Sequence, residues 1–192
     1  MISGNKNVQM SDPENTFFLN ALVKAGLDLS NSEINVSDSV VLDKYIETNG
    51  KLDYYEAYRL AMCLGIQLSA LEKTNKSILY FLPKDILRIN KDWYVIAEQN
   101  KQIVLLDNGS VIIEKPLNLN NRFVCPELHN KQLTLPCKSN CTCAYYSAAT
   151  IVYWTLQYKE VLHLSPINGS PLYYFLERCM LKNPAHRTYL LI

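Results

Sequence analysis

The chain has 192 residues, of which 48% are hydrophobic and 19% charged, a composition that excludes an intrinsically disordered protein. It carries 19 Lys and Arg against 18 Asp and Glu, a formal net charge of +1. This balance excludes the broad basic face with which proteins bind nucleic acid or anionic membranes. At this length we expect one compact domain that buries its core without disulfides or metals.

The sequence predicts a soluble, intracellular, cytoplasmic protein. Residues 1–12 are polar and lack the apolar stretch of a signal peptide. The longest apolar run, residues 145–156, is well short of the roughly 20 residues that span a bilayer, so we expect a buried helix there. In the reducing cytosol, the six cysteines are expected to be free thiols.

Helical patterns occur early in the chain. Ser11 or Asp12 caps a first predicted helix, with Pro13 in its first turn and Gly26 at its end. The rest of residues 1–50 is predicted to be irregular. Apolar residues at helical spacing then predict a long helix over residues 52–73.

The middle of the chain has the pattern of short strands. Three apolar runs joined by tight turns predict strands at residues 78–82, 86–89 and 93–96. Asp107-Asn108-Gly109-Ser110 lies between two further runs, 103–106 and 111–113, and predicts a hairpin, because Asn-Gly tolerates the positive φ of a tight turn. Two last helices are expected over residues 145–158 and 171–182, so the predicted fold class is α+β.

In this order, the elements resemble the C-terminal lobe of protein kinases. The predicted helix 52–73 is similar to the helix before a kinase catalytic loop. Phe81-Leu82-Pro83-Lys84-Asp85-Ile86-Leu87 resembles the family's Asp-Leu-Lys-Pro-Glu-Asn-Ile-Leu run. The strands 86–89 and 93–96 then match the hairpin that follows this run in kinases.

Three later segments extend the resemblance over about residues 52–190. Cys125-Pro126-Glu127-Leu128 resembles the Ala-Pro-Glu motif, and residues 144–149 resemble the start of the central kinase helix. Residues 175–187 resemble a late helix and turn that end in an arginine. The resemblance implies a structural ion pair between Glu127 and Arg187. It also implies a mainly helical C-lobe-like domain over residues 51–192, with residues 1–50 as a reduced N-terminal segment of the same compact unit.

Departures from the family pattern predict a pseudokinase. Residues 1–50 contain no Gly-x-Gly-x-x-Gly and no Val-Ala-Ile-Lys. The catalytic His-Arg-Asp falls on Ile78-Leu79-Tyr80, and the Asp that braces the catalytic loop is Ala144. With no base and no phosphate-binding lysine, phosphoryl transfer is not expected and no catalytic residue is assigned. We instead expect a scaffold that binds a protein partner, or a second copy of itself, through the surface that an N-lobe would cover.

Two alternatives remain open from the residues. A divergent kinase or ATP-binding protein would hold Mg²⁺ with Asp85 and Glu98, which fall at the family's metal positions; otherwise Asp85 caps a turn and Glu98 is solvated. A zinc-stabilised interaction module would use a cluster of soft ligands, which are otherwise buried free cysteines and a histidine: Cys125, His129, Cys137, Cys141 and Cys143. The Tyr-, Asn- and Ile-rich composition is similar to that of kinase-like proteins of large DNA viruses, which would place the protein in the host cytoplasm or the virion.

Overall fold

The computed structural model describes residues 13–26, 39–89, 93–97, 103–105, 107–114, 121–129, 134–156 and 165–191. These residues form an α+β fold of helices and small antiparallel sheets. The helices are α1 (Pro13–Lys24), α2 (Leu42–Asn49), α3 (Tyr54–Lys73), α4 (Cys143–Leu156) and α5 (Pro171–Cys179). The strands are β1 (Val40–Val41), β2 (Lys76–Ile78), β3 (Ile86–Ile89), β4 (Trp93–Ile96), β5 (Ile103–Leu105), β6 (Ser110–Ile113) and β7 (Cys137–Asn140).

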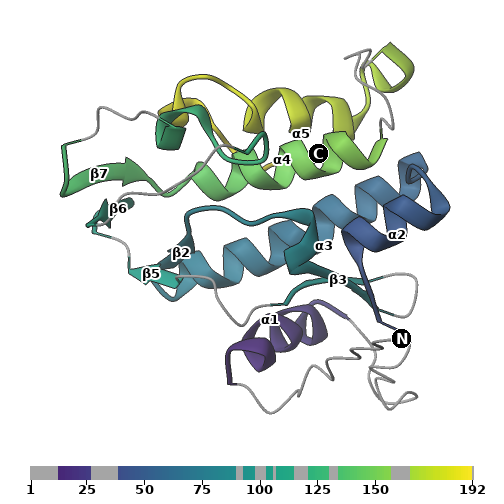
Figure 1. Cartoon of the computed structure of the whole chain (residues 1–192), viewed down its shortest axis with the longest axis horizontal. Helices are drawn as coiled ribbons and strands as arrows, with labels where there is room; N and C mark the ends of the chain where they lie inside the picture. The colour runs from purple at the N-terminus through teal and green to yellow at the C-terminus, as the bar shows by residue number, and fades with distance from the viewer. Residues whose placement is uncertain are drawn as a thin grey trace, which may run out of the picture.

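Helix α3 lies at the centre of the fold. In Figure 1 it runs across the middle of the molecule, with α4 and α5 on one side and α1 with β3 on the other. It begins at a capping box, in which the Asp53 carboxylate accepts the backbone N–H of Glu56 at 2.8 Å and the Glu56 carboxylate accepts that of Asp53. The helix predicted over residues 52–73 is therefore confirmed, with its start moved to Tyr54.

One buried cluster joins the helices to the three-stranded sheet. It includes Phe18 of α1, Leu42 of α2, Leu64 of α3, Ile151 of α4 and Phe175 of α5, each fully shielded from solvent. Because α1 and α2 contribute to the same core as α3, the described part of residues 13–49 packs as an integral part of the fold.

The sheet that packs on α3 has the strand order β1-β3-β4 and is antiparallel throughout. The buried amide of Gln67 joins α3 to β4. Its nitrogen donates to the carbonyls of Cys63 and Tyr94, and its oxygen accepts the N–H of Ile96, each at 2.8 Å. The Gln67 side chain thus forms hydrogen bonds with backbone groups of β4 that face away from β3.

The predicted hairpin around Asn108-Gly109 is correct in its turn and wrong in its strand partners. Asp107 and Ser110 exchange two backbone hydrogen bonds, and Asn108 and Gly109 both have positive φ, at 49° and 74°. However, β5 pairs with β2, and β6 pairs with β7. A turn sequence determines only where the chain reverses. Burial of Val111 and Ile113 against a second small core, which includes Leu128 and Cys143, accompanies the pairing of β6 with β7.

Two other sequence predictions need correction. The strand expected over residues 78–82 ends at Ile78, after which the buried side chains of Leu79 and Phe81 lie in irregular chain. The predicted irregular segment before residue 50 contains β1 and α2. Helix α2 has no side-chain cap at Val41, so the usual sequence marker of a helix start is missing. Among the described residues, none of the helices has the length and apolar character needed to cross a membrane.

Candidate functional site

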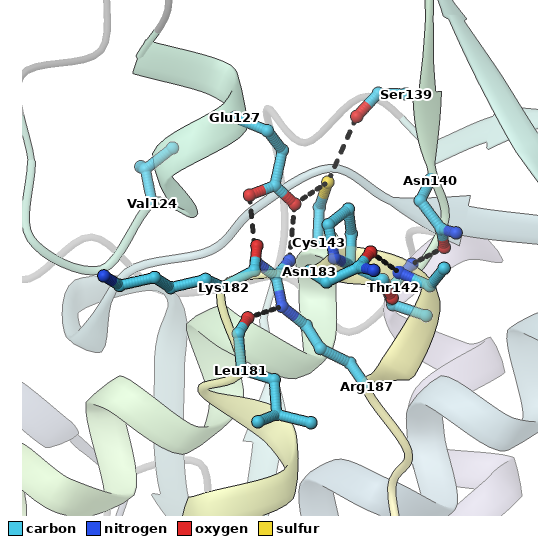
Figure 2. A network of polar contacts seen from close by, with 12 residues as sticks. Val124, Glu127, Ser139, Asn140, Thr142, Cys143, Leu181, Lys182, Asn183 and Arg187 are labelled. Atoms are coloured by element: carbon cyan, nitrogen blue, oxygen red, sulfur yellow. Dashed lines mark hydrogen bonds and ion pairs between the residues drawn. The ribbon is translucent and has the colours of Figure 1, made fainter.

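The best-defined polar site joins Arg187, near the C-terminus, to Glu127, 60 residues earlier. Glu127 lies in the 3-10 turn Pro126–His129, which we call the 127 turn. Arg187 directly follows another 3-10 turn, Pro184–His186. Arg187 Nη1 contacts Glu127 Oε1, and Nη2 donates to Oε2 at 2.9 Å, so the pair is bidentate (Figure 2). The Arg187 side chain is 0% exposed and that of Glu127 is 24% exposed.

Two further contacts of the buried guanidinium are with backbone carbonyls. Arg187 Nε donates to the carbonyl of Leu181 at 2.8 Å, and Nη2 reaches the carbonyl of Lys182 at 3.5 Å. The guanidinium carbon lies 5.1 Å from the centre of the Tyr146 ring, on α4. One side chain therefore joins the segment after α5, the 127 turn and α4.

Each of the two charges stabilises the ionised form of the other, which burial alone would disfavour. Burial by itself would raise the pKa of Glu127, but the hydrogen bond and charge of Arg187 outweigh it, so this pKa lies below its ordinary value of 4.5. Burial would lower the pKa of Arg187, but the hydrogen bond and charge of Glu127 reverse that effect and raise it. Both groups are ionised at neutral pH.

Two buried thiols lie beside this ion pair. The sulfurs of Cys125 and Cys143 and a carboxylate oxygen of Glu127 all lie within 4.8 Å of one another. Cys143 Sγ donates to Glu127 Oε1 at 3.5 Å and lies 3.3 Å from Ser139 Oγ. The hydrogen bond between the Cys125 thiol and the Cys143 sulfur, together with burial, raises the pKa of Cys125 well above its ordinary value. Cys125 is therefore protonated at neutral pH and a poor nucleophile.

The five zinc candidates do not form a common set of ligands in the described structure. His129 Nε2 lies 3.0 Å from the carbonyl of Val124, and Cys141 Sγ donates to Asn140 Oδ1 at 3.7 Å. Cys137 is half-buried in β7. Of the described groups, those within reach of one ion are Cys125, Glu127 and Cys143, whereas structural zinc takes four sulfur or nitrogen ligands. Because Arg187 already binds the Glu127 carboxylate, these residues fit zinc poorly.

Of the two Mg²⁺ candidates, Asp85 is among the residues that the structure describes. Asp85 ends the 3-10 turn Pro83–Asp85, and its Oδ2 accepts the backbone N–H of Leu82 at 2.6 Å. Its own carbonyl accepts the N–H of Ala97 at 2.8 Å. The Asp85 carboxylate therefore caps its own turn. Glu98 lies outside the described residues.

The segment matched to the kinase catalytic loop is apolar and largely buried. Ile78 is 1% exposed, Leu79 6% and Phe81 0%, and Tyr80 is half-buried. Ala144, which the resemblance matches to the bracing aspartate, is 1% exposed in the first turn of α4. This segment contributes to the two cores and offers no carboxylate to a substrate.

Sequence reasoning missed the polar contacts that fix the start of α4. Asn140 Oδ1 accepts the N–H of Thr142 at 3.0 Å (Figure 2). Thr142 Oγ1 donates to the carbonyl of Pro184 at 2.8 Å. The Asn-Cys-Thr sequence is compatible with an Asx-type turn, which could have identified the first contact. The second depends on a residue 42 positions away. Together they hold the β7–α4 turn against the segment that carries Arg187.

No protein-family model matches this chain, and no curated protein matches it at a significant level.

Proposed function

We propose that this protein is a catalytically inactive, protein-kinase-like module that binds a protein partner. The observation that carries this proposal is the chemistry of the segment matched to the catalytic loop. Ile78, Leu79 and Phe81 are buried apolar side chains at and beside the position where a phosphotransferase needs a proton acceptor. Such a segment can support a fold, but it has no group that could activate a hydroxyl.

The Glu127–Arg187 pair supports the kinase-like part of the proposal. The same two positions were singled out by the resemblance, and their side chains meet in a buried bidentate contact. The order of elements is also compatible with a C-lobe: α3, the β3–β4 pair, the 127 turn, α4 and α5.

A nucleotide-binding assay tests the inactive assignment. We expect no change in melting temperature when ATP and Mg²⁺ are added, because Asp85 is committed to Leu82 and no described residue supplies a phosphate-binding loop. A true nucleotide site would stabilise the fold by about 2.7 kcal/mol when the ligand is at 100 times its Kd. Stabilisation that requires Mg²⁺ and is lost in Asp85→Asn would overturn the proposal.

A binding assay tests the proposed binding of a protein partner. Affinity capture from the native cell, with cross-links mapped onto this chain, is expected to recover a protein that rebinds in purified form. A protein that stays monomeric and retains no partner under these conditions would contradict an interaction role.

A further inference from the structure

A groove follows one face of α3. It has two adjoining parts with volumes of about 790 and 450 Å³, which share Ala25, Met62 and Ile66. Its floor is the row of α3 side chains between Tyr55 and Lys73, and its walls include α1 and the C-terminal residues Tyr189 and Leu191. We refer to this surface as the α3 groove.

The lining of the α3 groove is mainly apolar. Tyr55 is 76% exposed and Met62 43%, and both are among the exposed large hydrophobic residues of the described structure. Residues 55, 62, 66 and 73 are spaced to lie along one helix face, about 27 Å long at roughly 1.5 Å per residue. A flexible methionine at the centre of such a stripe can adapt to an apolar partner side chain.

The charged residues among the described lining of the α3 groove are all basic. Lys24 and Lys73 line one part and Arg59 the other, and no Asp or Glu is among the described residues that line either part. Among the described lining residues, Lys24 and Lys73 give a local excess of positive charge in a chain whose net charge is only +1. It complements a ligand with acidic groups beside its apolar side chains.

The neighbouring sheet edge favours a helical ligand over a strand. Trp93, at the start of β4, lines the groove, and β4 is the last strand in the order β1-β3-β4. An added strand would need the outward backbone groups of β4, but the Gln67 side chain already binds the carbonyl of Tyr94 and the N–H of Ile96. Helix-in-groove binding needs only the apolar stripe and the flanking charges.

From these features we propose that the α3 groove binds an amphipathic helix of a partner protein, with acidic residues flanking its apolar face. This inference rests on the proposed role as an interaction module and names the surface and the partner chemistry. The proposed partner differs from a second copy of this chain. In a dimer, the basic side chains of the groove would need acidic partners from elsewhere on the surface of the other copy.

The test uses a fluorescein-labelled peptide of about 16 residues, with leucines at helical i, i+3, i+4, i+7 spacing and glutamates on its flanks. A matched peptide carries lysine at every glutamate position. Fluorescence anisotropy with the full-length protein is expected to show saturable binding of the glutamate peptide, and binding of the lysine peptide at least about tenfold weaker. The Lys24→Glu/Lys73→Glu double variant should reverse that preference, and Met62→Asp should weaken both peptides.

The control variant Lys44→Glu/Lys138→Glu changes the net charge by the same amount at exposed positions outside the groove, and should leave the preference unchanged. All variants are compared after their melting temperatures are shown to be similar. Equal binding of the two peptides, no binding, or equal effects of the two double variants would overturn the inference. So would concentration-dependent self-association that Met62→Asp abolishes, since a second copy would then cover the groove.

A failure of the groove proposal can be distinguished from a failure of the proposed function. Partner cross-links that fall outside the α3 groove would leave the module role intact and remove this surface from it. Mg²⁺-dependent nucleotide stabilisation would remove the module role whatever the peptides do.

Discussion

Arg187 reaches both carboxylate oxygens of Glu127 from a position 60 residues later in the chain, with its side chain fully buried. The contact is the main polar connection among the described residues between the C-terminal segment and the 127 turn. Its removal has consequences that differ from those of a surface ion pair.

Arg187→Ala should lower the free energy of unfolding by about 3–5 kcal/mol, because it leaves Glu127 without its counter-charge in a half-buried site and opens a cavity beside Tyr146. Urea denaturation measures this change. The matched control is Lys138→Ala, which breaks an exposed ion pair with Asp107 and should cost at most about 1 kcal/mol. Equal losses in the two variants would show that the buried pair contributes no more than a surface one.

The same pair predicts how stability depends on pH. Arg187 holds the pKa of Glu127 below 4.5, so the unfolded chain binds this proton more tightly than the folded one. The contribution of Glu127 to stability is therefore complete above about pH 4.5, the unfolded value, and is lost as the pH falls through the lower folded pKa. We expect the unfolding free energy of the wild type to fall more steeply below pH 4.5 than that of Glu127→Gln. Parallel curves for the two proteins in this range would contradict the assignment.

Gly65 and Tyr189 make a close contact that no side chain at position 65 could keep. A Cβ on Gly65 would lie 2.5 Å from Tyr189 Cε1, and the Tyr189 hydroxyl is held by the carbonyl of Ala61 at 2.6 Å. Gly65→Ala should therefore destabilise the protein by about 1–3 kcal/mol, although alanine is the better helix former.

The sign should reverse when the ring is removed. In a Tyr189→Leu background, Gly65→Ala has room for its methyl group and should raise the unfolding free energy by about 0.5–1 kcal/mol through helix propensity alone. A thermal or urea double-mutant cycle measures both values. A destabilisation of the same size in both backgrounds would mean that the Tyr189 ring is not the obstacle.

Thiol reactivity should divide the six cysteines by burial. Burial raises the pKa of Cys63 to about 11 and that of Cys179 to about 12, and Cys125 and Cys143 are also buried, whereas Cys137 and Cys141 are partly exposed. Since the thiolate is the reactive form and burial also raises the pKa of Cys141, a disulfide reagent such as Ellman's should label Cys137 first and Cys141 next in the folded protein. The other four should react after denaturation, as mass spectrometry of the labelled peptides can show. Rapid native labelling of Cys125 or Cys143 would contradict the burial of this pair.

Metal removal should have no effect on stability. The Glu127 carboxylate is bound by Arg187 and His129 lies against the Val124 carbonyl, so the described residues do not give Cys125 and Cys143 the further ligands that zinc requires. Elemental analysis of the purified protein should find no stoichiometric zinc, and dialysis against EDTA should leave the melting temperature unchanged. A stoichiometric metal whose loss lowers that temperature would restore the zinc-module alternative.

Local sequence was enough to locate the elements whose determinants are local. The apolar spacing over residues 52–73 placed α3 within two residues of its observed start, and the capping box at Asp53 and Glu56 is a local determinant of that start. Pro13 and Gly26 bounded α1 in the same way, and Asn108-Gly109 located a turn. Helix α2 was missed because Val41 supplies no cap to mark its start.

Tertiary packing alone decided that β5 pairs with β2 and β6 with β7. It also decided the grouping of Cys125 and Cys143 around Glu127 and the formation of the α3 groove. A cap, a turn or a helix face depends on residues a few positions apart, so it can be read from the chain. A strand partner, a ligand set or a groove depends on which distant segments bury apolar surface against one another. The free energy of that burial depends on the whole fold and not on neighbouring residues in the sequence. The Glu127–Arg187 contact was the exception among the long-range features, since only the resemblance to protein kinases indicated it.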